Sequence, residues 1–111
     1  MTDWVKEFNG AITICDVDGI IVYMNDKAVK TFESDGGDKL LGTNVLDCHP
    51  EPSRTQLKEM LANGKKNAYT IEKNGVKKII YQAPLFTDGI YSGFIELSLE
   101  IPFDMPNFLR K

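Results

Sequence analysis

The sequence has few of the residues that build catalytic or metal centres: two cysteines, Cys15 and Cys48, and a single histidine, His49. Two cysteines without Cys-x-x-Cys spacing are too few for a disulfide scaffold, so we expect both to be free thiols. One histidine argues against a catalytic triad and against a zinc site that needs two histidines. The chain also has no GxGxxG, GxxxxGK[ST] or HExxH motif. The sequence therefore predicts a protein without enzymatic activity.

An excess of basic charge is also missing, because 13 Lys and Arg stand against 16 Asp and Glu, for a net charge of −3. Such a chain has no basic field to release counterions from a nucleic acid, which argues against that partner. No apolar run approaches the roughly 18 residues of a membrane span, and no signal-peptide core is present near the start. We therefore expect a cytoplasmic protein. Its 111 residues suffice for one domain that folds without disulfides or metal.

Asp-Gly and Asn-Gly pairs, which supply the positive φ angles of tight turns, divide the chain at 18–19, 63–64, 74–75 and 88–89. Three of these pairs separate runs rich in β-branched and aromatic residues, which predicts strands on both sides of each turn. The predicted strands are Ala11–Val17, Ile20–Met24, Asn67–Lys73, Val76–Phe86 and Ile90–Ile101.

The middle of the chain is predicted to be helical. Ser53 and Gln56 form a capping-box pattern at the start of a helix over 53–63, and Gly64 fits the left-handed residue after its end. A shorter helix is expected to begin at Asn25 and run to Phe32, with broken one-turn helices and loops up to Pro52. The predicted order is two strands, several short helices and three strands, an α+β fold.

Several motifs mark the corners of this arrangement. They are the Asp-x-x-Gly within Ile14–Ile21, Asn25-x-x-Ala28, Leu40-Leu41-Gly42, Pro84 with Asp88 and Gly93, and Glu100-Ile101-Pro102. Their order and spacing resemble the PAS sensor domain over about residues 8 to 102. The resemblance implies a PAS domain at 11–102, an N-terminal flanking segment at 1–10 and a C-terminal tail at 103–111. It implies a PAS fold, a five-stranded antiparallel sheet with short helices between strands 2 and 3 that enclose a small cavity.

In the family's geometry, one parity of the last two strands points into the cavity. Glu96 and Gln82 belong to this parity, and a buried glutamate must be paired, hydrogen-bonded or neutral. We expect these two side chains to provide the polar groups of a small-molecule pocket, unless Glu96 lies near the edge and reaches water. The predicted ligand-binding residues are Phe32, Val45, Cys48, His49, Leu57, Met60, Ile80, Gln82, Phe94 and Glu96.

The cofactor is left open. In light-sensing LOV members a reactive cysteine follows the Leu-x-Gly motif, and here Val45 takes its place, so the resemblance argues against flavin. Haem is an alternative through His49, although the 53–63 helix, where related haem sensors carry their ligand, has no histidine. The segment 47–52 resembles a Cys-His-Pro-Pro element of some bacterial PAS-like domains. His49 could equally bond the loop backbone or contact an unidentified small ligand.

The opposite parity of the same two strands is apolar and should form one patch on the outer face of the sheet. The segment Thr2–Phe8 is too short to cover it, so we expect a homodimer. The resulting hypothesis is a non-catalytic signal-transduction module of the bacterial two-component kind that binds a ligand, dimerises, or both, to regulate a downstream protein or effector domain. A haem-based gas or redox sensor and a ligand-free dimerisation domain are the alternatives. The predicted dimer contacts are Trp4, Phe8, Tyr81, Ile95, Leu97 and Leu99.

Overall fold

The computed structural model of the chain describes residues 3–111, without the side chains of residues 3 and 48. The two groups of strands and the helical middle lie where the sequence predicts them, and the strand bounds differ from the prediction by no more than two residues. The elements in chain order are α1 (Asp3–Lys6), β1 (Ala11–Cys15), β2 (Ile21–Met24), α2 (Asp26–Thr31), the 3-10 helices η1 (Glu33–Asp35), η2 (Gly37–Leu40) and η3 (Val45–Cys48), α3 (Ser53–Asn63), β3 (Asn67–Lys73), β4 (Val76–Thr87) and β5 (Ile90–Ile101).

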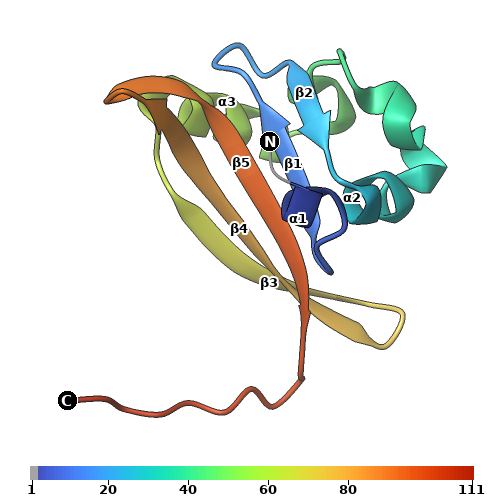
Figure 1. Cartoon of the computed structure of the whole chain (residues 1–111), viewed down its shortest axis with the longest axis vertical. Coiled ribbons are helices and arrows are strands. Elements are labelled where there is room, and N and C mark those ends of the chain that lie inside the picture. Colours follow the sequence, from blue (N-terminus) through green and yellow to red (C-terminus); the bar gives the residue numbers. More distant parts are fainter. Residues whose placement is uncertain (1–2) are drawn as a thin grey trace.

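The five strands form one antiparallel sheet in the order β2-β1-β5-β4-β3. The first strand of the chain therefore pairs with the last, and β5 lies in the centre (Figure 1). This arrangement joins the N-terminal hairpin and the C-terminal meander into a single sheet. It confirms the α+β fold with helices between strands 2 and 3.

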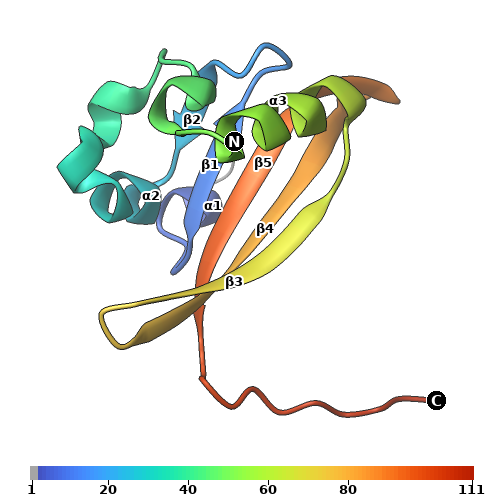
Figure 2. The same ribbon diagram turned by 180° about the vertical axis from the view of Figure 1, so that it is seen from behind.

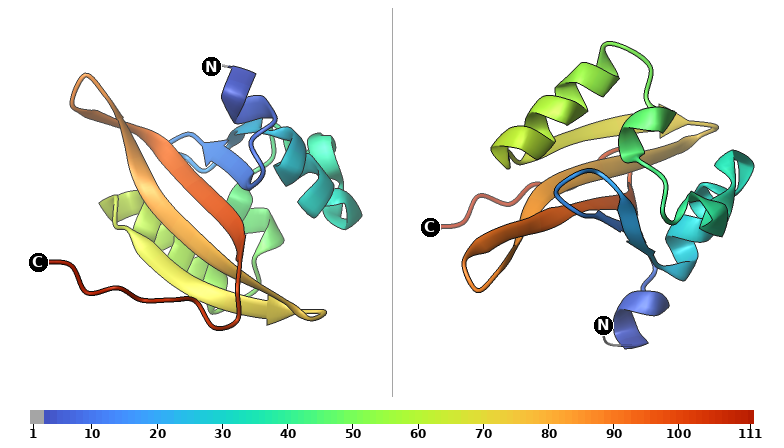
Figure 3. Two further views of the ribbon diagram at one scale, coloured as in Figure 1. Left: turned by 60° about the horizontal axis from the view of Figure 1, so that its bottom comes forward. Right: turned by 90° about the horizontal axis from the view of Figure 1, so that it is seen from above.

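The helices lie mostly on one face of the sheet, which we call the inner face. Figure 2 shows α3 crossing this face in front of the long strands, with α2 and the 3-10 helices beside β1 and β2. Seen from above, α3 lies on one side of the sheet and α1 on the other (Figure 3). The core has two clusters of buried residues, and Val45 packs against both. The clusters are Ala11, Ile21, Met24 and Ala28, and Cys15, Leu57, Leu61 and Phe94.

The turn chemistry explains the two C-terminal hairpins. Asn74 and Asp88 have φ angles of 54° and 52°, and the glycines that follow them have 78° and 81°. Two successive positive φ angles are typical of turns whose twist matches that of the flanking strands, and they favour Asn-Gly and Asp-Gly. The local sequence therefore fixes where β3 ends and where β5 begins.

Asn25 ties the N-terminal elements together and is fully buried. Its Oδ1 accepts from the backbone N–H of Ala28 at 3.0 Å, which confirms it as the N-cap of α2. The same oxygen accepts from the N–H of Ile12 at 2.9 Å. Its Nδ2 donates to the carbonyl oxygens of Val5 at 3.0 Å and Gly10 at 2.8 Å. The four hydrogen bonds of these two side-chain atoms thus join α1, β1 and α2.

The predicted capping box of α3 is wrong. Pro52 occupies the N-cap and Ser53 is the first helical residue, with no side-chain cap bond. The Glu51 carboxylate takes the role instead, since it accepts from the N–H of Thr55 at 3.0 Å and from its hydroxyl at 2.6 Å. The end of the helix follows the prediction, because Gly64 adopts the left-handed conformation at φ 61°.

On the outer face, the N-terminal segment leaves two of its three large apolar side chains exposed. Val5 is buried, but Trp4 is 66% exposed and Phe8 40% exposed. The rings of Trp4 and Phe8 pack edge to face with their centroids 6.1 Å apart. Residues 103–111 form neither helix nor strand and lead away from the sheet (Figure 1). Among the described residues, no helix is long and apolar enough to cross a membrane.

Candidate functional site

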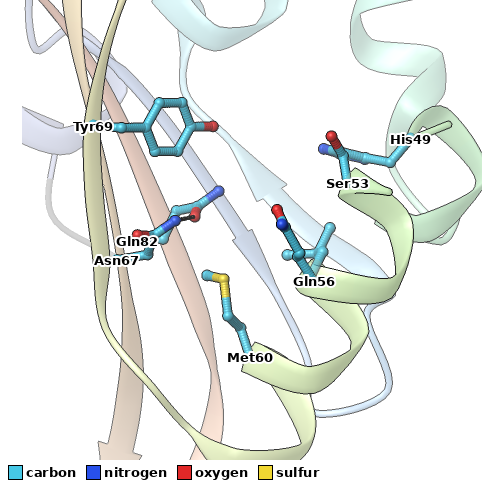
Figure 4. A pocket seen from close by; sticks show the side chains of 8 residues that line it. His49, Ser53, Gln56, Met60, Asn67, Tyr69 and Gln82 are labelled. Atoms are coloured by element: carbon cyan, nitrogen blue, oxygen red, sulfur yellow. Dashed lines mark hydrogen bonds between the residues drawn. The ribbon is translucent and has the colours of Figure 1, made fainter. Parts of the chain in front are cut away.

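A pocket opens between α3 and the inner face of β3 and β4 (Figure 4). In Figure 4, Gln56 and Met60 of α3 face Asn67 and Tyr69 of β3 across the opening. We call this part the polar lobe, with a volume of about 290 Å³. Its lining residues are His49, Ser53, Gln56, Leu57, Met60, Asn67, Tyr69 and Gln82.

A second part of about 190 Å³, the apolar lobe, lies nearer β2 and α2. A narrow neck of about 40 Å³ shares residues with both lobes, among them His49 in all three and Glu96 in two. We refer to the two lobes and the neck together as the inner pocket. The apolar lobe is lined by Thr13, Ile21, Met24, Phe32, Asp35, Leu40, Val45, His49 and Glu96, and the neck by Thr13, Cys15, Val45, His49, Leu57, Gln82, Phe94, Ile95 and Glu96.

His49 is held at the junction of the three parts by a local hydrogen bond. It is the C-cap of η3, and its Nδ1 lies 2.7 Å from the carbonyl oxygen of Val45. A carbonyl oxygen only accepts, so Nδ1 carries the hydrogen of this bond, and in the neutral ring Nε2 is then an acceptor. The predicted loop-backbone bond and the predicted place beside the ligand pocket are therefore compatible.

A row of polar side chains crosses the inner face from β3 to β5. Asn67 Nδ2 donates to Gln82 Oε1 at 3.3 Å, and Gln82 Nε2 lies 3.5 Å from Glu96 Oε2. Both distances are at the long end for N–H···O hydrogen bonds, so the Glu96 carboxyl is weakly paired. Burial raises the pKa of Glu96, against smaller opposing effects of Gln82 and His49. The Glu96 side chain is half-buried and lines the apolar lobe and the neck.

Eight of the ten predicted ligand-binding residues line the inner pocket. Ile80 is buried at 5% exposure opposite Tyr69, but it lines neither lobe nor the neck. The side chain of Cys48 lies outside the described part of the chain, so its predicted contact stays a prediction. The eight are Phe32, Val45, His49, Leu57, Met60, Gln82, Phe94 and Glu96.

Sequence reasoning missed the polar residues of α3 and β3. Ser53 and Gln56 were interpreted as a capping box, although their spacing to Leu57 and Met60 places all four on one side of a helix. Asn67 and Tyr69 share the parity of β3 that pairs with Gln82 and Ile80, so the predicted strand register could have found them.

The lining bears on the two large cofactors that the resemblance raises. Val45 lines the neck and the apolar lobe where light-sensing relatives would need a cysteine. A haem needs an extended apolar slot, whereas the larger lobe beside His49 is lined mostly by amides and hydroxyls. Among the described residues, no group of three His, Cys, Asp or Glu side chains is arranged to hold a metal ion.

Comparison with known proteins agrees with this architecture. A receptor from Vibrio cholerae, Aer2, described as a dual PAS-heme oxygen sensor, is 16% identical with a TM-score of 0.68, over 84% of this chain and 95% of that one. A C-terminal domain from Streptococcus mutans is 24% identical with a TM-score of 0.70, over 86% and 78% of the two chains. A sensory box sensor histidine kinase from Vibrio cholerae is 19% identical with a TM-score of 0.61, over 92% and 89%.

At these identities the three structures show the fold alone. No curated protein matches the chain. The family model described as PAS domain, however, matches residues 9–97, which include the whole sheet up to Leu97 and every predicted residue of the inner pocket. The chain therefore belongs to the PAS domain family.

Proposed function

We propose that this chain is a non-catalytic sensory module that binds a small molecule in the inner pocket and passes the binding event to a signalling partner in the cytoplasm. The observation that carries the proposal is the weakly paired Glu96 carboxyl, which lines the apolar lobe and the neck. Small-molecule sites typically combine apolar walls with a few convergent polar groups, and this pocket has both.

The arrangement of the strands suits a sensor. Glu96 and Gln82 are cross-strand partners on β5 and β4, while His49 and Met60 come from the helical side of the pocket. A ligand that contacts both sides changes the contacts between α3 and the sheet. Because β5 leads directly into residues 102–111, such a change can reach a following domain or a bound protein.

Native mass spectrometry of the untreated protein tests the proposal. We expect an adduct of small mass on the unmodified chain and its loss in Glu96→Leu, which keeps a side chain of similar size but removes the carboxyl. Glu100→Leu is the matched control, since Glu100 is exposed on the same strand and does not line the inner pocket.

Three outcomes would contradict or redirect the proposal. An adduct that survives Glu96→Leu would place the ligand elsewhere. A second outcome is a protein that carries no adduct and shows no shift of its inner-pocket amide resonances with any compound of a fragment library. That result would favour the alternative of a ligand-free dimerisation domain. A Soret band in the absorption spectrum would identify haem, with His49 as its candidate ligand.

We also propose that two copies associate through the outer face of the sheet. Tyr81 pairs with Leu97 across β4 and β5, so their side chains share this face. Ala83 and Ile95 have the same parity, although Ile95 also borders the neck. Tyr81 is 38% exposed, and Trp4 adds a largely exposed ring at the side where α1 lies. A large exposed apolar patch is typical of an interaction site, and two-fold dimers are the commonest assembly of identical chains.

A further inference from the structure

We propose that the inner pocket selects a small planar organic cation that carries adjacent N–H donors, of the amidinium, guanidinium or protonated aminoheterocycle type. This inference rests on the proposed function, because it names the ligand class of the same pocket. It is argued from the charges, the free acceptors and the shape of the lining.

The lining carries carboxyl groups and no permanent cation. Glu96 lies at the junction of the apolar lobe and the neck, and Asp35 lies at the apolar lobe. None of the described side chains that line the two lobes and the neck is lysine or arginine. An anionic ligand would therefore enter without a counter-charge, whereas a cation would find one.

The hydrogen bonds within the pocket leave acceptors for a ligand. The amides are oriented in one direction, with Asn67 donating to Gln82 and Gln82 to Glu96, so the Glu96 carboxyl is the last acceptor of the row. Its single amide donor lies 3.5 Å away. The neutral ring of His49 adds a second acceptor at Nε2, because its Nδ1 hydrogen is donated to the Val45 carbonyl oxygen. A ligand with two or more N–H donors satisfies both groups.

A carboxylate in this position is costly while the pocket is empty. Burial raises the pKa of Glu96, so its charged form is disfavoured in the folded protein. Paired N–H donors of a planar cation bind a carboxylate through two parallel hydrogen bonds, which are stronger than those of a neutral amide. The hydrogen bonds of the cation thus replace those that the Glu96 carboxylate has lost to water on burial.

The shape of the pocket adds the requirement for a flat body. The apolar lobe beside Glu96 has a volume of about 190 Å³, small for a ligand site, and it fits a single ring system better than a large cofactor. Its walls are aliphatic, sulfur-containing and aromatic side chains. They are Ile21, Met24, Phe32, Leu40 and Val45.

Three probes of nearly equal shape test the charge preference on the whole chain: benzamidine (a cation), benzamide (neutral) and benzoate (an anion). We expect benzamidine to shift the amide resonances of Val45 and Glu96 and to bind about tenfold or more tightly than benzamide, with benzoate the weakest. Glu96→Gln should reduce benzamidine binding to the level of benzamide. Glu100→Gln, on the same strand but outside the pocket, should leave it unchanged.

The outcomes separate this inference from the proposed function. Benzoate binding as tightly as benzamidine, or benzamidine binding that is unaffected by Glu96→Gln, overturns the cation preference, while the pocket remains a ligand site. The absence of shifts with all three probes overturns the inference as well. The sensory proposal itself is judged by the adduct and its loss in Glu96→Leu, a measurement in which none of the three probes is used.

Discussion

Gln82 and Glu96 face each other on neighbouring strands of the inner face, with the side-chain nitrogen of one 3.5 Å from a carboxyl oxygen of the other. The pair connects β4 to the central strand beside the neck of the inner pocket, which both side chains line. A carboxylate loses its hydrogen bonds to water on burial, and one long hydrogen bond from a neutral amide replaces them poorly. The stability of the domain should therefore depend on the ionisation of Glu96.

We predict that replacing Glu96 by glutamine changes how stability depends on pH. Burial raises the folded-state pKa of Glu96, so the folded protein holds this proton to a higher pH than the unfolded chain. The free energy of unfolding that comes from this group is fully present below the unfolded pKa of about 4.3 and is lost as the pH rises through the folded pKa. Urea unfolding should find Glu96→Gln equal to the unmodified protein near about pH 4 and more stable near about pH 8.

Glu100→Gln is the control for that experiment, because Glu100 lies on the same strand with an exposed side chain. It should give the same pH dependence as the unmodified protein. If Glu96→Gln also leaves the pH dependence unchanged, the Glu96 carboxyl is not desolvated and its role in ligand selection loses its physical basis.

The second prediction concerns Asn25, whose two side-chain atoms make four backbone hydrogen bonds in a fully buried position. Asn25→Ala should lower the free energy of unfolding by roughly 3 kcal/mol, because it leaves several buried backbone groups without partners. Asn25→Asp keeps a good N-cap for α2 but turns a carboxylate towards the carbonyls of Val5 and Gly10, so it should also be destabilising.

The matched control is Asn44→Ala. Asn44 is partly exposed and makes two such bonds, to Leu46 and Asp18, so its loss should cost only about 1 kcal/mol. Urea denaturation compares the three variants. Equal costs for Asn25→Ala and Asn44→Ala would show that the joining of α1, β1 and α2 by Asn25 adds no stability.

The two asparagines illustrate how far the sequence predicts this fold. The N-cap role of Asn25 depends on a residue three positions away and was predictable, as were the hairpins at Asn74 and Asp88. The bonds of Asn25 to Val5 and Gly10 join residues 20 and 15 positions apart, and no local pattern encodes them. The predicted capping of α3 failed for a related reason. The Glu51 side chain, two residues before Ser53, accepts the backbone hydrogen bond at the start of the helix in place of the Ser53 side chain.

The candidate site was predictable in β4 and β5, where alternation separates the side chains into two faces. The alternation does not show which face is the inner one; the resemblance to the PAS domain implied that Gln82 and Glu96 point into the pocket, which both line. β3 is an edge strand whose two parities are both largely polar, and its residues are exposed along its whole length. The composition of β3 does not indicate that Asn67 and Tyr69 turn towards α3. The register of its pairing with β4 does, because it places them opposite Gln82 and Ile80.

The third prediction is that the thiol of Cys15 is unreactive in the folded protein. Cys15 is 6% exposed, and burial raises its pKa to about 11. Only the thiolate attacks disulfide reagents, so in a Cys48→Ser background labelling near neutral pH should be about a hundredfold or more slower than in a model peptide. The same protein in urea is the control and should react at the rate of the peptide. Fast labelling without urea would mean that the core beside the neck opens readily.

The last prediction tests the outer face as a dimer interface. Tyr81 and Leu97 are cross-strand partners there, and each copy contributes both of them to a two-fold interface. A glutamate at either position should cost about 2 kcal/mol per copy, which raises the dissociation constant of the dimer by roughly a thousandfold. Sedimentation equilibrium at tens of micromolar should therefore find a dimer for the unmodified protein and a monomer of 12.5 kDa for Tyr81→Glu and Leu97→Glu.

Two further variants make the dimer result interpretable. Ile90→Glu changes a 72% exposed residue at the β4–β5 hairpin, away from the proposed interface, and should leave the dimer intact. Leu61→Glu places a charge in the core at a residue that is 5% exposed and should unfold the domain, as circular dichroism would detect. Dissociation by Tyr81→Glu with a native spectrum thus assigns the effect to the interface. An unmodified protein that sediments as a monomer at these concentrations would remove the dimer, while the pocket and its ligand would still be tested by the Glu96 variants.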